Sequence, residues 1–353
     1  MQTNFSLAQL ADPKTADAES IVRKCVHCGL CTATCPTYVT LGNELDSPRG
    51  RIYLIKDMFE NGRDADEETA LHVDRCLSCL SCTTTCPSGV DYMHLIDLAR
   101  EHVEKTYDRP VADRLARGVL AWVLPYPGRF RLALKAAGLG KKLPLTRPFG
   151  HMLDLAPQSV PAKSRFAEAG RFAPKGERRG RVAMLSGCAQ PVLKPEINEA
   201  TIRLLNGLGV EVIIAEGESC CGSLTHHMGR EEQALASVRN NVDVWTREIE
   251  NGGLDAIIIT ASGCGTTIKD YGHMLARDPA YAAKAARVAS LAKDITEYLS
   301  ILDLPQLPAN GRTVAHHSAC SMQHGQKITT LPKLLLQKAG YKVKEPAEGH
   351  LCC

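Results

Sequence analysis

Two runs of cysteine near the N-terminus share one spacing. The first is Cys25-Val-His-Cys28-Gly-Leu-Cys31-Thr-Ala-Thr-Cys35-Pro, and the second is Cys76-Leu-Ser-Cys79-Leu-Ser-Cys82-Thr-Thr-Thr-Cys86-Pro. Both read C-x2-C-x2-C-x3-C-P, the spacing that binds four-iron clusters in bacterial ferredoxins. A tight loop with a thiolate at every third residue can reach three corners of one cube, but the fourth thiolate lies too far along the chain to reach the same cube.

In a two-cluster ferredoxin, that fourth thiolate binds the other cluster, so the two runs interlock. We therefore expect two [4Fe–4S] clusters with crossed ligands. The first is assigned to Cys25, Cys28, Cys31 and Cys86, and the second to Cys76, Cys79, Cys82 and Cys35. Zinc is the weaker alternative because its structural sites close with two pairs of ligands, so a third cysteine at the same interval would be in excess.

Bulk properties exclude several classes of protein. The 353 residues include fifteen cysteines, and the N-terminus has no secretory leader, which favours metal ligands in a reducing, cytoplasmic compartment over disulfides. No run of about 18 apolar residues is present, so we expect no transmembrane segment. The net charge of +3 argues against a nucleic-acid partner.

Charge is uneven within the chain. Residues 109–150 hold nine Arg or Lys and one acid, Asp113, interleaved with Leu, Ala and Phe. Two interpretations stay open: a linker with short helices packed on the domains, or an amphipathic surface for anionic lipid or an acidic partner. The second would place the protein peripherally on the inner face of the cytoplasmic membrane.

The cysteine runs must be positioned by helices. Ser47-Pro48 resembles a helix start with Ser as N-cap, and residues 51–59 place Ile52, Ile55 and Phe59 on one face. Residues 92–103 also show helical spacing. We expect a helical two-cluster domain over 1–106, followed by a basic helical connector and linker over 107–180.

From residue 181 the pattern changes to strands alternating with helices. Apolar runs at 182–185, 210–215 and 256–260 alternate with helical spacing at 197–208 and 230–249, which predicts a parallel α/β sheet. Cysteines follow the ends of these runs, at Cys188, Cys220, Cys221 and Cys264. Since sites in parallel sheets gather at the carboxyl ends of strands, these four sulfurs are candidate ligands of a second site.

This pattern begins again near the C-terminus. A strand over 313–317 precedes Cys320, and a helix over 331–338 precedes Cys352 and Cys353. The interval from Cys188 to Cys220 recurs between Cys320 and Cys352. We therefore expect two Cys-rich α/β units, over 181–311 and 312–353, with the second cut short at its C-terminus and its three cysteines as further candidate ligands.

The combination resembles a known family, the iron–sulfur subunits of glycolate oxidase, anaerobic glycerol-3-phosphate dehydrogenase and lactate-oxidation systems. Heterodisulfide reductase subunits share the Cys-rich units. Four segments favour the glycolate oxidase branch. They are the Cys25–Tyr38 run, Asp46-Ser-Pro-Arg-Gly-Arg-Ile-Tyr-Leu-Ile-Lys56, Gly187-Cys-Ala-Gln-Pro191 and Thr260-Ala-Ser-Gly-Cys-Gly265. The likeness runs from about residue 17 to the end.

The resemblance implies that flavin-bearing partner subunits, which would hold FAD, oxidise glycolate to glyoxylate, with D-lactate as a further substrate. This chain would pass the electrons to a quinone or a similar membrane acceptor. It also implies one further iron–sulfur cluster in the Cys-rich units, although Thr267 stands where the family has the last ligand. The sequence shows no dinucleotide-binding loop and no P-loop, so an electron carrier without catalytic residues of its own is favoured.

Two alternatives of other classes stay open. One is a catalytic disulfide or quinone reductase that uses the Cys-rich site. The other is a zinc-stapled interaction module. His27 and Arg75 flank the cysteine runs and are expected to tune the clusters. The remaining histidines near the second site are expected to be ordinary loop or core residues. They are His226, His227, His316, His317 and His324.

Overall fold

The computed structural model describes residues 1–140 and 156–352, and its contacts group them into two compact units. The first comprises Met1–Arg109, Thr225–Glu231 and Leu302–Cys353, and the second Pro110–Leu224 and Glu232–Ile301. Each unit is described by itself. The mixture of a helical N-terminal part and a mainly parallel sheet confirms the fold class that the sequence predicts.

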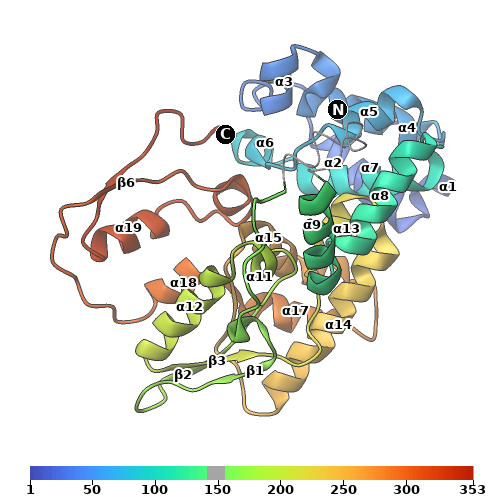
Figure 1. The fold of residues 1–353 in the computed structure, drawn as a ribbon. Coiled ribbons are helices and arrows are strands. Elements are labelled where there is room, and N and C mark those ends of the chain that lie inside the picture. The colour runs from blue at the N-terminus through green and yellow to red at the C-terminus, as the bar shows by residue number, and fades with distance from the viewer. Residues whose placement is uncertain (141–155, 353) are drawn as a thin grey trace. The chain divides into compact units, whose positions relative to one another are not determined.

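Helices form the N-terminal part of the first unit (Figure 1). They are α1 (Leu7–Leu10), α2 (Pro13–Arg23), α3 (Pro36–Leu41), the 3-10 turn η1 (Glu44–Asp46), α4 (Pro48–Glu60), α5 (Glu67–Asp74), α6 (Ser81–Thr85) and α7 (Tyr92–Thr106). Ser47 caps α4 by accepting a hydrogen bond from the Gly50 amide, with Pro48 in the first turn, as the sequence predicts. Ile55, Met58 and Leu95 are fully buried between α2, α4, α5 and α7, and they hold the cysteine runs on a packed helical base.

The rest of the first unit comes from the C-terminus. Strands β6 (Thr313–Ala315) and β7 (Lys342–Lys344) pair in parallel, and α19 (Leu331–Lys338) connects them. The π-helical turn η4 (Ser321–Gly325) lies between β6 and α19. The structure thus contains the strand–helix–strand start of a second α/β unit, as predicted, and this segment contacts α6.

The second unit is built on a five-stranded sheet of order β1-β3-β2-β4-β5. Its strands are β1 (Gly170–Phe172), β2 (Gly180–Met184), β3 (Val210–Ile214), β4 (Ala256–Ile259) and β5 (Ala292–Asp294). All neighbours are parallel except β1, which runs antiparallel to β3. Val182, Ala183 and Met184 are all fully buried, as expected for a parallel sheet covered on both faces.

Helices and short turns make up the rest of the second unit. They are α8 (Val111–Val123), α9 (Pro127–Gly140), η3 (Arg165–Ala167), α11 (Gln190–Leu193), α12 (Pro195–Gly207), α14 (Glu231–Glu250), α15 (Ser262–Lys269), α16 (Tyr271–Met274), α17 (Ala282–Leu291) and α18 (Ile295–Ser300). The short helix α13 (Ser223–His227) is divided between the units, because Thr225–Glu231 belongs to the first. Trp245 of α14 is the largest fully buried side chain of the core beneath β2 and β4. Among the described residues, no helix is both long and apolar enough to cross a bilayer.

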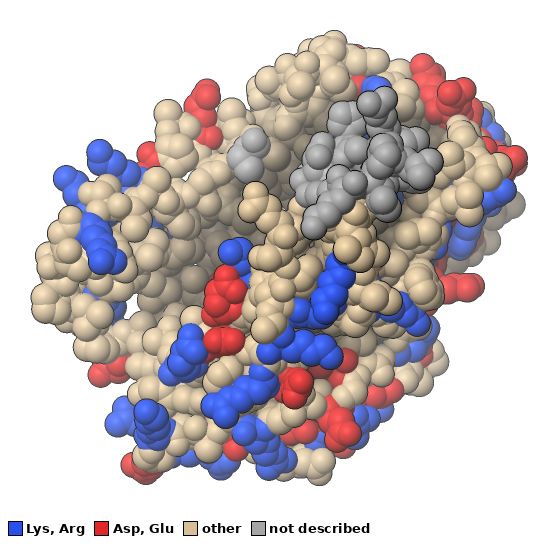
Figure 2. All heavy atoms as spheres, viewed as in Figure 1, with Lys and Arg blue, Asp and Glu red and all other residues tan. Residues whose placement is uncertain are grey.

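Basic side chains recur over the face of the second unit around β1, β2 and β3, with acidic ones between them (Figure 2). Arg178 and Arg181, for example, both pair with Glu211 there. Because the charges on this face are mixed, they do not by themselves mark a binding surface.

Candidate iron–sulfur site

Both cysteine runs adopt the same strained loop. In the first run, His27 and Gly29 have φ of 55° and 82°, and in the second run Ser78 and Leu80 have φ of 49° and 61°. These are the residues immediately before and after the second cysteine of each run. A left-handed conformation costs roughly 1–2 kcal/mol at a non-glycine residue. The positive φ angles at equivalent positions turn the backbone of each run around its own cavity.

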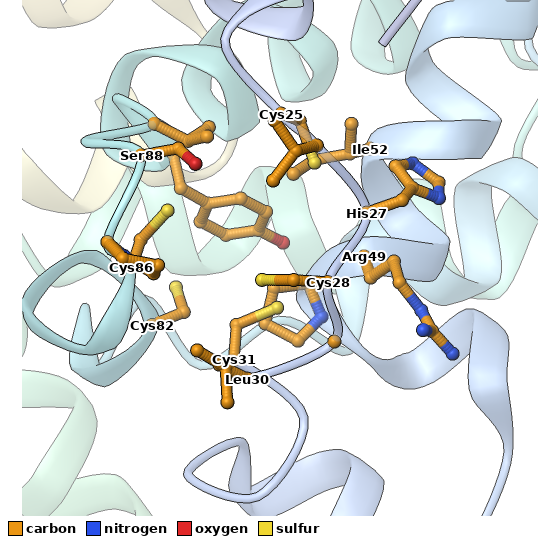
Figure 3. A pocket seen from close by; sticks show the side chains of 16 residues that line it. Cys25, His27, Cys28, Leu30, Cys31, Arg49, Ile52, Cys82, Cys86 and Ser88 are labelled. Atoms are coloured by element: carbon orange, nitrogen blue, oxygen red, sulfur yellow. The ribbon is translucent and has the colours of Figure 1, made fainter.

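The first cavity lies inside the first loop, and Figure 3 shows its wall. It encloses about 440 Å³, part of it open to solvent, and cysteines of both runs line it. They are Cys25, Cys28 and Cys31 of the first run with Cys82 and Cys86 of the second. The structure therefore places Cys86 beside the three cysteines to which the spacing argument assigns it.

The second cavity measures about 340 Å³, part of it open to solvent. Its cysteines are Cys35 of the first run with Cys76, Cys79 and Cys82 of the second. Cys82 and Tyr92 line both cavities, so they form part of the wall between the two. Each cavity thus has the four thiols that the crossed arrangement requires, three from one run and one from the other.

The donor set fits a four-iron cluster in each cavity. All fourteen described cysteines are free of disulfides. Within residues 1–140 and 156–352, no group of three Cys, His, Asp or Glu side chains is placed to hold a single metal ion. Burial raises the pKa of the Cys31 and Cys79 thiols to about 11 and that of Cys82 well above 9.0. Because iron binds the thiolate, cluster binding must offset that cost of ionisation.

A buried polar network adjoins the second cavity. Arg51 of α4 is 1% exposed, and its Nη1 lies 3.9 Å from the Cys35 sulfur. Its other nitrogens donate to the His72 carbonyl at 2.6 Å, to Thr37 Oγ1 at 3.1 Å and to Asp46 Oδ1 at 3.3 Å. Asp46 also accepts hydrogen bonds from His72 Nδ1 at 2.9 Å and Arg75 Nη1 at 3.1 Å.

Sequence reasoning assigned no role to Arg51, Asp46, His72 or Tyr92. Asp46 and Arg51 do lie in the segment Asp46–Lys56, one of the four that carry the family resemblance. That resemblance was the sequence signal that could have pointed to them. Of the two residues expected to tune the clusters, His27 lines the first cavity, and Arg75 contacts Asp46. Burial, and then the charge of Arg49, lowers the pKa of His27 below 6.5. Its Nε2 atom is buried without a hydrogen-bond partner.

The second group of cysteines lies where three parallel strands end. Cys188 follows β2, Cys220 and Cys221 follow β3, and Cys264 is in α15 directly after β4. The sulfurs of Cys220 and Cys188 lie 3.5 Å apart, and the Cys221 thiol interacts with those of Cys220 and Cys264. The structure thus brings these four sulfurs together. The thiol–thiol hydrogen bond raises the pKa of Cys188 and lowers that of Cys220.

Thr267 closes one side of this group. It is 5% exposed in α15, and its hydroxyl donates to the Gly263 carbonyl at 3.2 Å. This hydroxyl is therefore engaged with its own helix. The third group is less complete: Cys320 precedes η4 and Cys352 follows β7, both in the first unit, whereas Cys353 lies outside the described residues.

The histidines divide between different contacts. His226 Nε2 lies 3.1 Å from Asp97 Oδ2, and His227 Nδ1 lies 3.4 Å from Asp97 Oδ1, within the first unit. His324 is buried and bonds to Thr84 Oγ1 at 2.7 Å and to the His350 carbonyl at 2.9 Å. His317 contacts the Leu351 carbonyl at 3.2 Å.

Comparison with known proteins identifies the two kinds of domain and the family. Residues 21–90 match the family described as "4Fe-4S dicluster domain", and residues 182–269 match "Cysteine-rich domain". The glycolate oxidase iron-sulfur subunit of Escherichia coli is 44% identical over all of this chain and 84% of its own length. The probable glycolate oxidase iron-sulfur subunit of Bacillus subtilis is 30% identical over 95% of this chain and 79% of its own length.

More distant relatives include lactate utilization protein A of Bacillus licheniformis, which is 24% identical over 49% of this chain and 71% of its own length. No solved structure matches. The resemblance that the sequence suggested is confirmed: this chain belongs to the family of glycolate oxidase iron–sulfur subunits.

Proposed function

We propose that this chain is the electron-transfer subunit of a flavin-dependent glycolate oxidase. The observation that carries the proposal is the pair of cavities, each lined by three cysteines of one run and at least one of the other. Glycolate oxidation to glyoxylate releases two electrons and two protons, which an FAD-bearing partner subunit would accept. A pair of [4Fe–4S] clusters, when bound, accepts such electrons one at a time.

The residues of this chain hold and isolate the two sites. Cys25, Cys28, Cys31 and Cys86 would bind one cluster, and Cys76, Cys79, Cys82 and Cys35 the other. The packed helices behind them keep water from the inner faces, with Leu95 and Ile55 fully buried. The acceptor would be a quinone or a similar membrane-bound oxidant, as the family resemblance implies.

The Cys188, Cys220, Cys221 and Cys264 group is a candidate for one further cluster. The close approach of the Cys188 and Cys220 sulfurs supports it. The heterodisulfide-reductase type of catalysis that the sequence left open is less favoured, because position 267 offers a hydroxyl bonded to Gly263 where that site would need a thiolate. Cys320, Cys352 and Cys353 stay candidate ligands by the repeat alone.

The decisive experiment is anaerobic purification from the native host with the partner subunits attached. We expect flavoprotein subunits to co-purify. Addition of glycolate should reduce the iron–sulfur clusters, and electron paramagnetic resonance would measure that reduction. Parallel reactions with D-lactate and glycerol 3-phosphate define the substrate. A chain that contains zinc and no acid-labile sulfide would refute the proposal. Catalytic reduction of a disulfide by this chain, with dithionite as the electron donor and no flavoprotein, would refute it as well.

A further inference from the structure

We propose that Arg51 sets the order of the two reduction potentials, making the cluster of the second cavity easier to reduce than the cluster of the first. This inference rests on the proposed function for the presence of the two clusters, but it concerns residues that do not bind iron. It begins from an asymmetry between the hydrogen bonds to the two sets of sulfurs.

Three side chains form hydrogen bonds with sulfurs of the second cavity, and the Thr37 hydroxyl is one of them, 3.2 Å from the Cys35 sulfur. Arg51 Nη1 points at the Cys35 sulfur at 3.9 Å, and the Tyr92 hydroxyl donates to the Cys76 sulfur at 3.8 Å. Both side chains also line the cavity, and both are buried, at 1% and 4% exposed. Hydrogen bonds to cluster sulfurs and nearby positive charge stabilise the reduced, more negative cluster, which raises its reduction potential.

The first cavity lacks such donors among the described residues. Between the described residues, no side-chain hydrogen bond reaches the sulfurs of Cys25, Cys28, Cys31 or Cys86, although the Arg49 backbone amide bonds to Cys31. The Arg49 guanidinium points away from the sulfurs (Figure 3) and pairs with Glu44 at 2.7 Å.

The charge beside the second cavity is a net cation. Asp46, fully buried, is the only acid in contact with Arg51 among the described residues, and Arg75 also pairs with it at 3.1 Å. Two guanidinium groups therefore face one carboxylate. Arg75 is 42% exposed, so solvent screens its charge, whereas Arg51 acts across a dry contact where electrostatic interactions are stronger.

The network also fixes where the Arg51 charge lies. The bonds to the His72 carbonyl and to Thr37 hold both ends of the guanidinium, and His72 and Arg75 hold its counter-ion Asp46. A lysine could supply the charge but not the planar set of donors. Arg51 is therefore a positioning and tuning residue, and one electron passing from the first cluster to the second would move downhill without any bond or proton change.

The test is a redox titration of the full chain with both clusters bound, followed by electron paramagnetic resonance. Cys79→Ser identifies the signal of the second cluster, and we expect it to be the one with the higher potential. The double variant Arg51→Met with Asp46→Asn removes the ion pair without leaving a buried charge. It should shift that cluster's reduction equilibrium at least tenfold towards the oxidised form, about 59 mV for one electron.

Arg49→Met, two positions earlier on α4, is the matched control and should leave the second cluster unchanged. Arg51→Lys should lie between the parent and the double variant, and Tyr92→Phe should give a smaller shift of the same sign. A double variant with full iron content and an unchanged potential would overturn the proposal, as would a Cys79→Ser variant that loses the lower-potential signal. If the Arg51 variants lose iron, the potential of the second cluster in Tyr92→Phe takes their place: a lower potential supports the proposal, and an unchanged one overturns it. Absence of both clusters from the parent chain would instead refute the proposed function.

Discussion

Cys86 links the two cysteine runs at the scale of single residues. It belongs to the second run in sequence, yet it lines the first cavity with Cys25, Cys28 and Cys31. Cys86→Ser should therefore damage the cluster of the first cavity and leave the other largely intact. Cys79→Ser is the matched comparison and should do the reverse. Iron analysis with electron paramagnetic resonance measures both, and loss of only the second cluster in Cys86→Ser would contradict the crossed arrangement.

Asp97 is a second residue whose effect can be measured. Burial alone would raise its pKa, but hydrogen bonds from His226 and His227 outweigh burial and hold the pKa of Asp97 well below 3.8. Arg100 also faces it, at 3.8 Å. Since the folded pKa is depressed, the stabilisation is complete above pH of about 4 and is lost as the pH falls further.

Asp97→Asn should accordingly destabilise the chain by about 3 kcal/mol at pH 7, because it leaves the buried Arg100 and the partly exposed histidines without their charged partner. The measurement is the urea midpoint of parent and variant at pH 7, 5 and 3. The difference should persist at pH 5 and shrink at pH 3. A difference that is the same at all three values would mean that the ionised carboxylate is not what stabilises this contact.

Residue types and spacing pointed to the eight cysteines that line the two cavities, and their binding to clusters stays a prediction. Type and spacing could not predict Arg51 or Asp46, because a charged residue in an amphipathic helix or turn ordinarily faces solvent. Only the folded chain shows that Arg51 is enclosed by Asp46, Thr37 and the His72 carbonyl. His226 and His227 were expected to be ordinary loop residues, and their contact with Asp97, far away in sequence, could not be read from spacing.

At the scale of elements, Gly50 lets η1 approach α4. A Cβ at this position would lie 2.1 Å from the Glu44 carbonyl oxygen, which is rigid backbone. Gly50→Ala should push η1 away, displace Asp46 from Arg51 and lower both stability and iron retention. Gly118→Ala on α8 is the control, because nothing lies within 4 Å of its added Cβ. It should be neutral or stabilising by up to about 1 kcal/mol.

Thermal unfolding and iron content of the two glycine variants measure this contrast. The expected loss for Gly50→Ala is about 1–3 kcal/mol, in the range for overpacking a close contact. Equal melting temperatures and equal iron content for both variants would show that η1 can move without consequence for the site.

The elements with strong patterns were predicted well. The apolar runs at 182–185, 210–215 and 256–260 correspond to β2, β3 and β4. The segments with helical spacing at 197–208 and 230–249 correspond to α12 and α14. The three-residue strands β1 and β5 were missed. Gly170–Phe172 lay in a stretch expected to be linker, and it is a strand because its backbone pairs with β3. Such short edge strands are determined by a partner distant in sequence, so their own residues carry little signal.

At the scale of the whole molecule, contacts group parts of the chain that sequence order separates. Thr225–Glu231 joins the N-terminal helices, and Glu231 and Glu101 share the Lys14 ammonium group. Leu302–Cys353 belongs to the same unit. The division into four consecutive domains, with boundaries at 106, 180 and 311, stays a proposal. Sequence pattern can only divide a chain into consecutive segments, so it could not predict that segments far apart in sequence belong to one unit.

The second unit carries an apolar stripe that its own core does not use. Val111, Leu115, Val119 and Trp122 of α8 are 61%, 63%, 58% and 61% exposed, and their spacing places them on one side of the helix. Arg129 lies 4.7 Å from the ring centroid of Trp122. The opposite side of α8 packs through Ala121, which is 1% exposed and whose carbonyl accepts from Gln233. The combination of exposed Leu and Trp with nearby Arg is typical of helices that lie in a membrane interface.

This stripe should hold the protein at an anionic membrane. The basic segment over 109–150 also includes Lys141, Lys142 and Arg147. These three residues lie outside the described residues, so the test uses α8. Leu115→Ser with Trp122→Ser removes two side chains, each worth roughly 1.5–3 kcal/mol when buried, and should weaken sedimentation with phosphatidylglycerol vesicles at least tenfold. Leu204→Ser, an exposed apolar residue on α12, is the control and should bind as the parent does. High salt should weaken the parent as well, because the basic residues contribute by long-range attraction. Equal sedimentation of the parent and the double variant at low salt would exclude the stripe as the membrane contact. If the parent binds vesicles only after the flavoprotein is removed, the stripe belongs to the subunit interface instead.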